Sequence, residues 1–166
     1  MSLIKKKPMQ KSKQIGIIVD DLSASQLSYY LIKNVNGYLE DSLDDFVVFF
    51  ENAMSSIITP EFSTMAVNEI WNFEGVLIST SISSTLSMLK SPSPERKIFY
   101  VWDLEWLRQH GKEFENTIKA FASNDITLIA RSKEHALAIE NYCNVKTEHI
   151  IEDFNIKKLM RTINNE

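Results

Sequence analysis

Four short stretches of the sequence carry side chains that could bind a small ligand. Each stretch follows an apolar segment typical of a buried β-strand and contains carboxylates, hydroxyls, aromatic rings or a guanidinium. The candidate ligand-binding residues in these stretches are Asp20, Asp21, Ser23, Ser79, Ser81, Trp102, Asp103, Trp106, Arg131 and Ser132. Because ligands of open α/β sheets bind at the carboxyl ends of the strands, we expect the four stretches to meet at one edge of a sheet.

The aromatic and acidic candidates suit a hydroxylated ligand. Trp102 and Trp106, around Asp103 and Glu105, combine flat apolar faces with carboxylates, as a sugar ring requires for stacking and for its hydroxyls. The alternative is that Asp103 caps a helix and that both tryptophans pack on the sheet or on a partner. Asp20 and Asp21 allow two interpretations. They could form a metal-binding or general-base pair, or one carboxylate could order the loop while the other is solvated, and we favour the second interpretation.

A self-contained active site is not evident in the sequence. A phosphate cradle needs glycines, and none of the four glycines lies in the loop after the first expected strand. The three histidines share no metal-ligand spacing, a Gly-x-Ser-x-Gly nucleophile elbow is absent, and Cys143 falls on the buried face of an expected helix. We therefore assign no catalytic residue and expect neither a metal nor a cofactor.

Strands and helices alternate along the sequence. Apolar runs predict strands at 15–19, 46–50, 75–79, 97–101 and 126–130, with shorter strands at 63–67 and 149–151. Apolar spacing of three and four predicts helices at 27–39, 80–89, 103–121, 133–143 and 155–163. Ser23 and Gln26 are placed to cap the first helix, and Ser132 is placed to cap the fourth. This order predicts an α/β fold, in which a Rossmann-like, mostly parallel sheet is flanked by helices in three αβα layers.

The composition indicates one globular domain behind a basic N-terminal tail. Hydrophobic residues make up 44% and charged residues 24% of the chain, which we divide into a flexible tail, 1–13, and a single Rossmann-like domain, 14–166. Five lysines fall in the tail, so the domain holds 13 basic and 22 acidic residues, a balance that repels nucleic acid. One cysteine and the absence of any apolar run of about 20 residues indicate a cytoplasmic protein without a membrane span.

Taken in order, these segments resemble the N-terminal domain of the retaining, two-domain GT-B glycosyltransferases. The first strand and helix, 15–39, and a strand that ends in small polar residues and a helix, 75–89, occur there in the same order. Residues 101–103 are similar to a strand that runs into an aromatic or histidine and an aspartate, and 127–132 to the next strand with its capping serine. The segment 150–155 stands in the place of the loop of Pro-Asn-Gly-x-Asp type that closes this half.

The resemblance implies an acceptor-side domain that lacks the donor-binding half. In that family the second domain holds most of the donor-nucleotide site, and this chain stops where that domain would begin. The sequence also departs from the family pattern, because Trp102 replaces the histidine and the expected glycines after the first strand and in the closing loop are missing. We therefore expect a domain that binds a sugar or nucleotide-sugar and is either completed by a protein partner or homodimer or degenerate. The resemblance implies that Trp102 and Asp103 orient the acceptor and that Arg131 meets a phosphate.

The alternative function is a non-catalytic, Rossmann-like protein-interaction module. Such a module would act through exposed aromatic side chains, because aromatic residues are enriched at protein interfaces. The sequence offers Trp71, Trp102 and Trp106 for this role.

Overall fold

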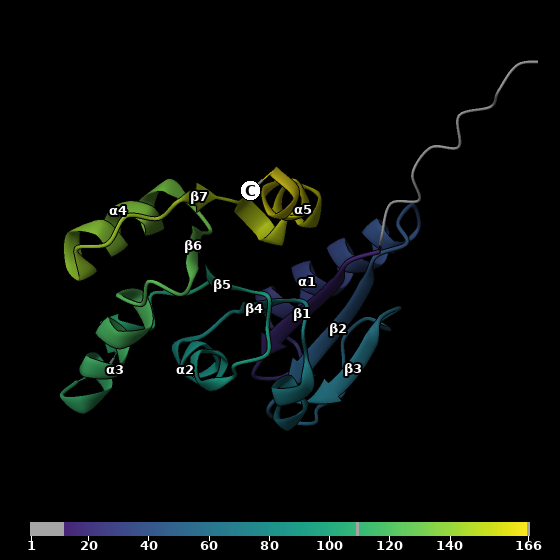
Figure 1. Cartoon of the computed structure of the whole chain (residues 1–166), viewed down its shortest axis with the longest axis horizontal. Helices are drawn as coiled ribbons and strands as arrows, with labels where there is room; N and C mark the ends of the chain where they lie inside the picture. Colours follow the sequence, from purple (N-terminus) through teal and green to yellow (C-terminus); the bar gives the residue numbers. More distant parts are fainter. Residues whose placement is uncertain (1–11, 109, 166) are drawn as a thin grey trace, which may run out of the picture.

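The computed structural model describes residues 12–108 and 110–165, and it confirms the expected parallel sheet. Seven strands lie in the order β3-β2-β1-β4-β5-β6-β7, each parallel to its neighbours. They are β1 (Gln14–Val19), β2 (Asp45–Phe50), β3 (Ser63–Ala66), β4 (Val76–Ser79), β5 (Arg96–Val101), β6 (Thr127–Ala130) and β7 (His149–Ile150). The chain builds the sheet outward from β1 in one direction and then from β4 in the other, so the strand order reverses between β1 and β4 (Figure 1).

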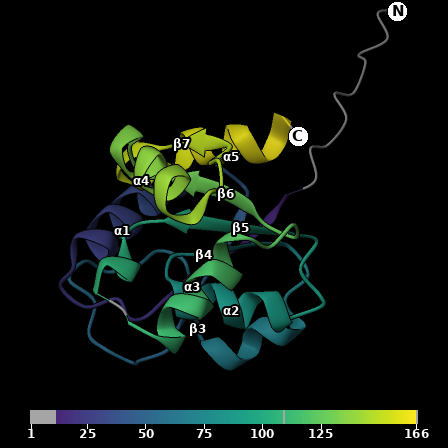
Figure 2. The same ribbon diagram turned by 90° about the vertical axis from the view of Figure 1, so that its left-hand side faces the viewer.

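Helices connect most of the strands and cover both faces of the sheet (Figures 1 and 2). The α-helices are α1 (Gln26–Leu39), α2 (Ile82–Lys90), α3 (Lys112–Phe121), α4 (Lys133–Cys143) and α5 (Ile156–Asn165). Three short 3₁₀ helices accompany them, namely η1 (Val67–Asn72), η2 (Glu105–Arg108) and η3 (Glu152–Phe154). The connection from β2 to β3 contains no helix.

Each face of the sheet buries its own apolar core. On one face, alternate β1 residues such as Ile15 and Ile17 pack with side chains of α1 and α5. On the other face, Ile18 belongs to a core that includes side chains of η1, α2, α3 and α4. A sheet that is covered on both faces requires strands that are apolar on both sides. The two cores therefore confirm the three-layer αβα arrangement.

One glycine is required where β4 begins beside β1. A Cβ built on Gly75 would lie 2.2 Å from the backbone oxygen of Gln14, far inside van der Waals contact. The absence of a side chain at this position therefore permits the close approach of the two strands at the centre of the sheet.

Two of the expected helix starts are wrong. Ser25 caps α1, because its Oγ accepts a hydrogen bond from the Ser28 backbone N–H at 3.1 Å. The backbone N–H of Ser23 instead donates to the Asp21 carboxylate at 2.8 Å, so the expected capping pair of Ser23 and Gln26 does not form. The second helix begins at Ile82, with Ser81 as its cap, rather than at residue 80.

The expected continuous helix at 103–121 is also wrong. The chain forms η2 first, and α3 begins only after Gly111, whose φ of +62° lies outside the right-handed helical region. The Asp103 carboxylate accepts from the Leu104 backbone N–H at 2.8 Å, which favours a turn directly after β5. The apolar spacing that predicted one helix is therefore shared between η2 and α3.

A strained turn joins β7 to α5. Asp153 and Phe154 have φ values of +50° and +51°, a conformation that costs a residue with a Cβ about 1 kcal/mol or more. The Asn34 side chain of α1 donates to the carbonyls of both residues, at 2.7 and 3.1 Å. The buried Tyr100 hydroxyl accepts from the Phe154 backbone N–H at 3.1 Å and donates to the Ile151 carbonyl. These hydrogen bonds hold the turn against its strain.

The expected flexible tail, 1–13, lies outside the described residues except for Ser12 and Lys13. The Lys13 backbone N–H donates to the Asp44 carboxylate at 3.0 Å, so this residue is tied to the segment that precedes β2. The flexibility of the preceding residues stays a prediction.

Candidate functional site

The reversal of strand order brings two of the four candidate stretches together. Asp20 follows β1 and Ser81 follows β4, and the Ser81 hydroxyl donates to the Asp20 carboxylate at 3.3 Å. The Thr80 hydroxyl donates to the Ile18 carbonyl at 2.8 Å, which fixes the end of β4 to the end of β1. In open α/β folds, the carboxyl edge at such a reversal is the usual ligand site.

A carboxylate that was not selected from the sequence closes the N-terminus of α2. Glu105 Oε1 accepts from the Ile82 backbone N–H at 3.0 Å, while Ser81 forms a capping box with Ser84. Burial raises the pKa of Glu105 to about 7, with the charges of Asp20 and Asp103 acting in the same direction. A helix N-terminus is a common seat for a ligand phosphate, and here the carboxylate of the chain itself occupies it.

Further acids make this part of the sheet edge negative. Asp20 and Asp103 are exposed, and Asp103 forms an ion pair with the exposed Arg108. Burial raises the pKa of Glu51 at the end of β2, and the Asp20 charge raises it further. Within the described part of the chain, no group of three or more His, Cys, Asp or Glu side chains could hold a metal ion. The acids are therefore better suited to accept hydrogen bonds from hydroxyls than to bind an anion.

Arg131, the candidate residue after β6, lies over the ring of Trp102, the candidate residue after β5. The Arg131 guanidinium is 3.9 Å from the centre of the Trp102 ring and donates to the Trp102 carbonyl at 3.4 Å. It also donates to the Gln26 side chain in the first turn of α1 at 3.2 Å. Trp102 is only 9% exposed and also contacts Tyr30 and Tyr100. One face of the Trp102 ring is thus covered by Arg131, which leaves little of the ring for a ligand to stack on.

Trp106 lies in the core beneath α3 and α4. It is 2% exposed, meets Phe121 edge to face and stacks on Tyr142. Its indole N–H is buried and has no hydrogen-bond partner within the described residues. Because Glu105 precedes it in η2, the burial of Trp106 positions Glu105 beside α2.

The remaining candidates hold local structure. Asp21 accepts from both the backbone N–H and the hydroxyl of Ser23, so it orders the loop after β1 as favoured from the sequence. Ser79 is fully buried, lies 2.7 Å from the Thr85 hydroxyl and donates to the Ile98 carbonyl. Ser132 caps α4, as predicted, by accepting from the His135 backbone N–H at 3.2 Å.

The structure therefore brings together only part of the selected set. Asp20 and Ser81 meet, with the unselected Glu105 beside them, and Trp102 and Arg131 meet at the next strands along the sheet. Ser79 and Trp106 lie in the core and are not open to a ligand. The ligand-binding role of the others stays a prediction.

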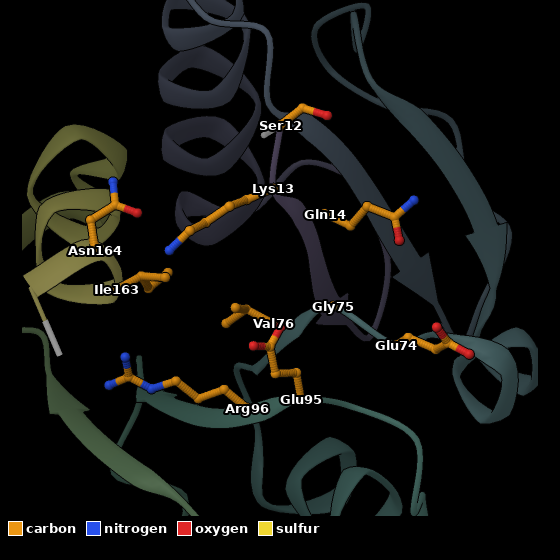
Figure 3. Close-up of a pocket in the computed structure, with 10 residues that line it drawn as sticks. All are labelled: Ser12, Lys13, Gln14, Glu74, Gly75, Val76, Glu95, Arg96, Ile163 and Asn164. Atoms are coloured by element: carbon orange, nitrogen blue, oxygen red, sulfur yellow. The ribbon is translucent and has the colours of Figure 1, made fainter. Parts of the chain in front are cut away.

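A hollow of about 950 Å³ lies at the opposite, amino edge of the sheet. The starts of β1, β4 and β5 and the end of α5 line it, and Figure 3 shows Lys13 and Arg96 reaching toward the α5 side while Glu74 lies across from them. None of the candidate residues contributes to it. This hollow carries charges of both signs and lies away from the strand ends at the carboxyl edge. We therefore do not connect it with the candidate site.

The fold and the residues at its carboxyl edge define a class, the Rossmann-like α/β domains. No helix of the described residues is long and apolar enough to cross a membrane. Comparison with known proteins found no matching family model, no matching curated protein and no matching solved structure. The proposal for the function of the chain therefore rests on the geometry of the candidate site.

Proposed function

We propose that the chain is a glycosyltransferase-like, acceptor-side domain that binds a hydroxylated sugar or glycoside at the carboxyl edge of its sheet. The observation that carries this proposal is the cluster of Asp20, Ser81 and Glu105 at the reversal of strand order. Carboxylate and hydroxyl oxygens accept the hydrogen bonds that sugar hydroxyls donate, and a few such groups suffice to orient a small ligand. Asp103, exposed at the end of the next strand, can add a further acceptor.

The same geometry argues against a nucleotide as the ligand of this edge. The loop after β1 contains no glycine, the N-terminus of α2 is closed by Glu105, and the surrounding acids repel phosphate. The Arg131 guanidinium, which the resemblance assigned to a phosphate, already contacts Trp102 and Gln26. We therefore assign the donor to a second polypeptide or a second copy of this chain, which would complete the site.

The order of elements in the fold also supports the proposal. The strand and helix β1 and α1, the strand β4 with its small polar end, and the aromatic–acidic pair after β5 follow one another as the resemblance requires. The strained turn at 153–154 takes the place of the closing loop, in which the family has a glycine.

A thermal-shift screen of the whole chain tests this proposal. A ligand at 100 times its Kd stabilises the fold by about 2.7 kcal/mol, which raises the Tm of a domain of this size by roughly 5 to 10 °C. We expect a shift with a neutral sugar or glycoside, no shift with free nucleotides, and loss of the shift in Asp20→Ala. The matched control is Asp41→Ala, an exposed acid just after α1. Stabilisation by free nucleotides alone, or by none of the ligands, would contradict the proposal.

The alternative, a protein-interaction module, has less support. It depended on three exposed tryptophans, and of these only Trp71 is exposed, at 47%. Trp102 and Trp106 are 9% and 2% exposed, so they cannot form an aromatic interaction surface together with Trp71.

A further inference from the structure

Another hollow, of about 400 Å³, opens at the carboxyl edge next to the proposed sugar site. Leu22, from the loop after β1, and Phe50, the last residue of β2, contribute its apolar lining. The rest comes from the connection between β2 and β3 and from Thr64 of β3. Its volume falls within the range of roughly 300 to 1,000 Å³ that is usual for small-molecule sites.

The connection that lines this hollow is held in place although it has no regular structure. At its start, the Asn52 backbone N–H donates to the Asp20 carbonyl at 2.8 Å. Near its end, the Asn36 side chain of α1 donates to the Thr59 carbonyl at 2.9 Å and accepts from the Glu61 backbone N–H at 3.0 Å. Irregular connections of this length are uncommon in compact domains and often carry function. These hydrogen bonds hold both ends of the connection, which lowers the cost of ordering it on binding.

The side chains that line the hollow fit an uncharged ligand with one apolar face. Leu22, Phe50 and Met54 supply apolar surface, while Asn52, Ser55, Ser56 and Thr64 supply amide and hydroxyl groups. None of the described residues that line the hollow carries a charged side chain. The carboxylates of Asp20 and Glu51 belong to the same sheet edge, so an anionic ligand would meet repulsion there.

We propose that this hollow holds the acceptor of the proposed sugar site, and that this acceptor is a neutral glycoside. Its apolar ring face or aglycone packs on Phe50 and Met54, and its hydroxyls bind the polar side chains of the connection. This inference rests on the proposed function and deepens it, because it names the class of acceptor and places it on the β2 side of Asp20.

Titration of the whole chain with a panel of neutral 4-nitrophenyl glycosides tests the inference. Amide chemical shifts report the Kd, and glucose 6-phosphate serves as the anionic probe. Ala53→Phe fills the hollow from an exposed lining position, and Ala24→Phe adds the same ring at an exposed position of the neighbouring loop that does not line it. We expect Ala53→Phe to weaken binding at least about tenfold and Ala24→Phe to leave the Kd within about twofold of the unmodified chain.

The outcomes separate this inference from the proposed function. One outcome would overturn only the inference: glycosides bind the unmodified chain, Asp20→Ala weakens this binding, and Ala53→Phe leaves it unchanged. The acceptor would then lie outside the hollow. Tighter binding of glucose 6-phosphate than of every neutral glycoside would overturn the neutral class. Failure of all glycosides and simple sugars to bind the unmodified chain would overturn both proposals.

Discussion

Replacing Glu105 by Gln should make the protein more stable at pH 8 than the unmodified chain. Glu105 is partly buried between η2 and α2, and its pKa is about 7 in the folded chain, against an ordinary value of 4.5. The folded state therefore holds a proton that the unfolded chain releases, so this residue's favourable contribution is present below about pH 4.5 and is lost as the pH rises through 7. Gln has no charge to bury and keeps an oxygen that can accept from Ile82.

The size of the effect follows from the difference between the two pKa values. At 1.36 kcal/mol per pH unit, the change from 4.5 to about 7 corresponds to about 3 kcal/mol. Because the side chain is only partly buried, solvent screening reduces this to about 1 to 2 kcal/mol. We expect the stability advantage of E105Q over the unmodified chain to grow by this amount between pH 5 and pH 8.

Urea unfolding followed by circular dichroism at pH 5, 6, 7 and 8 measures this change. The two proteins are identical at every other position, and the comparison at each pH isolates the effect of residue 105. Glu148→Gln is the matched control, because it removes one negative charge from an exposed position before β7 and should show a difference that stays constant within about 0.5 kcal/mol. A difference between E105Q and the unmodified chain that does not grow with pH would refute the reasoning.

Four further changes test the fold, each by the urea midpoint of unfolding. Gly75→Ala should lower the free energy of unfolding by about 3 kcal/mol or more, or prevent folding, because its Cβ would lie 2.2 Å from a β1 carbonyl oxygen. Gly37→Ala in α1, where a Cβ would meet nothing within 4 Å, should instead raise the free energy of unfolding by about 0.5 to 1 kcal/mol. Tyr100→Phe should cost about 1 to 3 kcal/mol, because it leaves the buried backbone groups of the turn before α5 without their hydroxyl partner. Asp153→Gly should gain about 1 kcal/mol by removing a Cβ at positive φ, and a loss of stability there would show that the turn is not strained.

The sequence predicted the strands better than the helix starts. The runs 15–19 and 46–50 are apolar on both faces, as a strand covered on both sides requires, and most of their side chains are buried. The start of a helix depends on which of several nearby polar groups accepts a hydrogen bond from a given backbone N–H. Here the backbone N–H of Ser23 donates to the Asp21 carboxylate, so Ser23 does not act as the helix cap. The order of the strands depends on pairing between distant segments, which no local pattern records.

The candidate site could be predicted only where position along a strand decides it. Asp20 and Ser81 each follow a strand, so the parallel sheet alone places them at one edge. Trp106 stands between Glu105 and Leu107, so its neighbours in the sequence do not decide its burial, which follows from the packing of α3 and α4. Glu105 stands in the aromatic and acidic stretch after β5, but the expected continuous helix from residue 103 did not predict its contact with α2. The break into η2 directs its carboxylate there.

One arginine couples three loops of the carboxyl edge. Arg131 follows β6, lies over the Trp102 ring after β5 and reaches Gln26 at the start of α1. Strand pairing already holds the ends of β5 and β6 side by side, so the link that Arg131 adds is the one to α1. A lysine, with one point charge in place of a planar fork, could not meet both partners in the same way. A ligand that binds the guanidinium would therefore have to compete with its contacts to both Trp102 and Gln26.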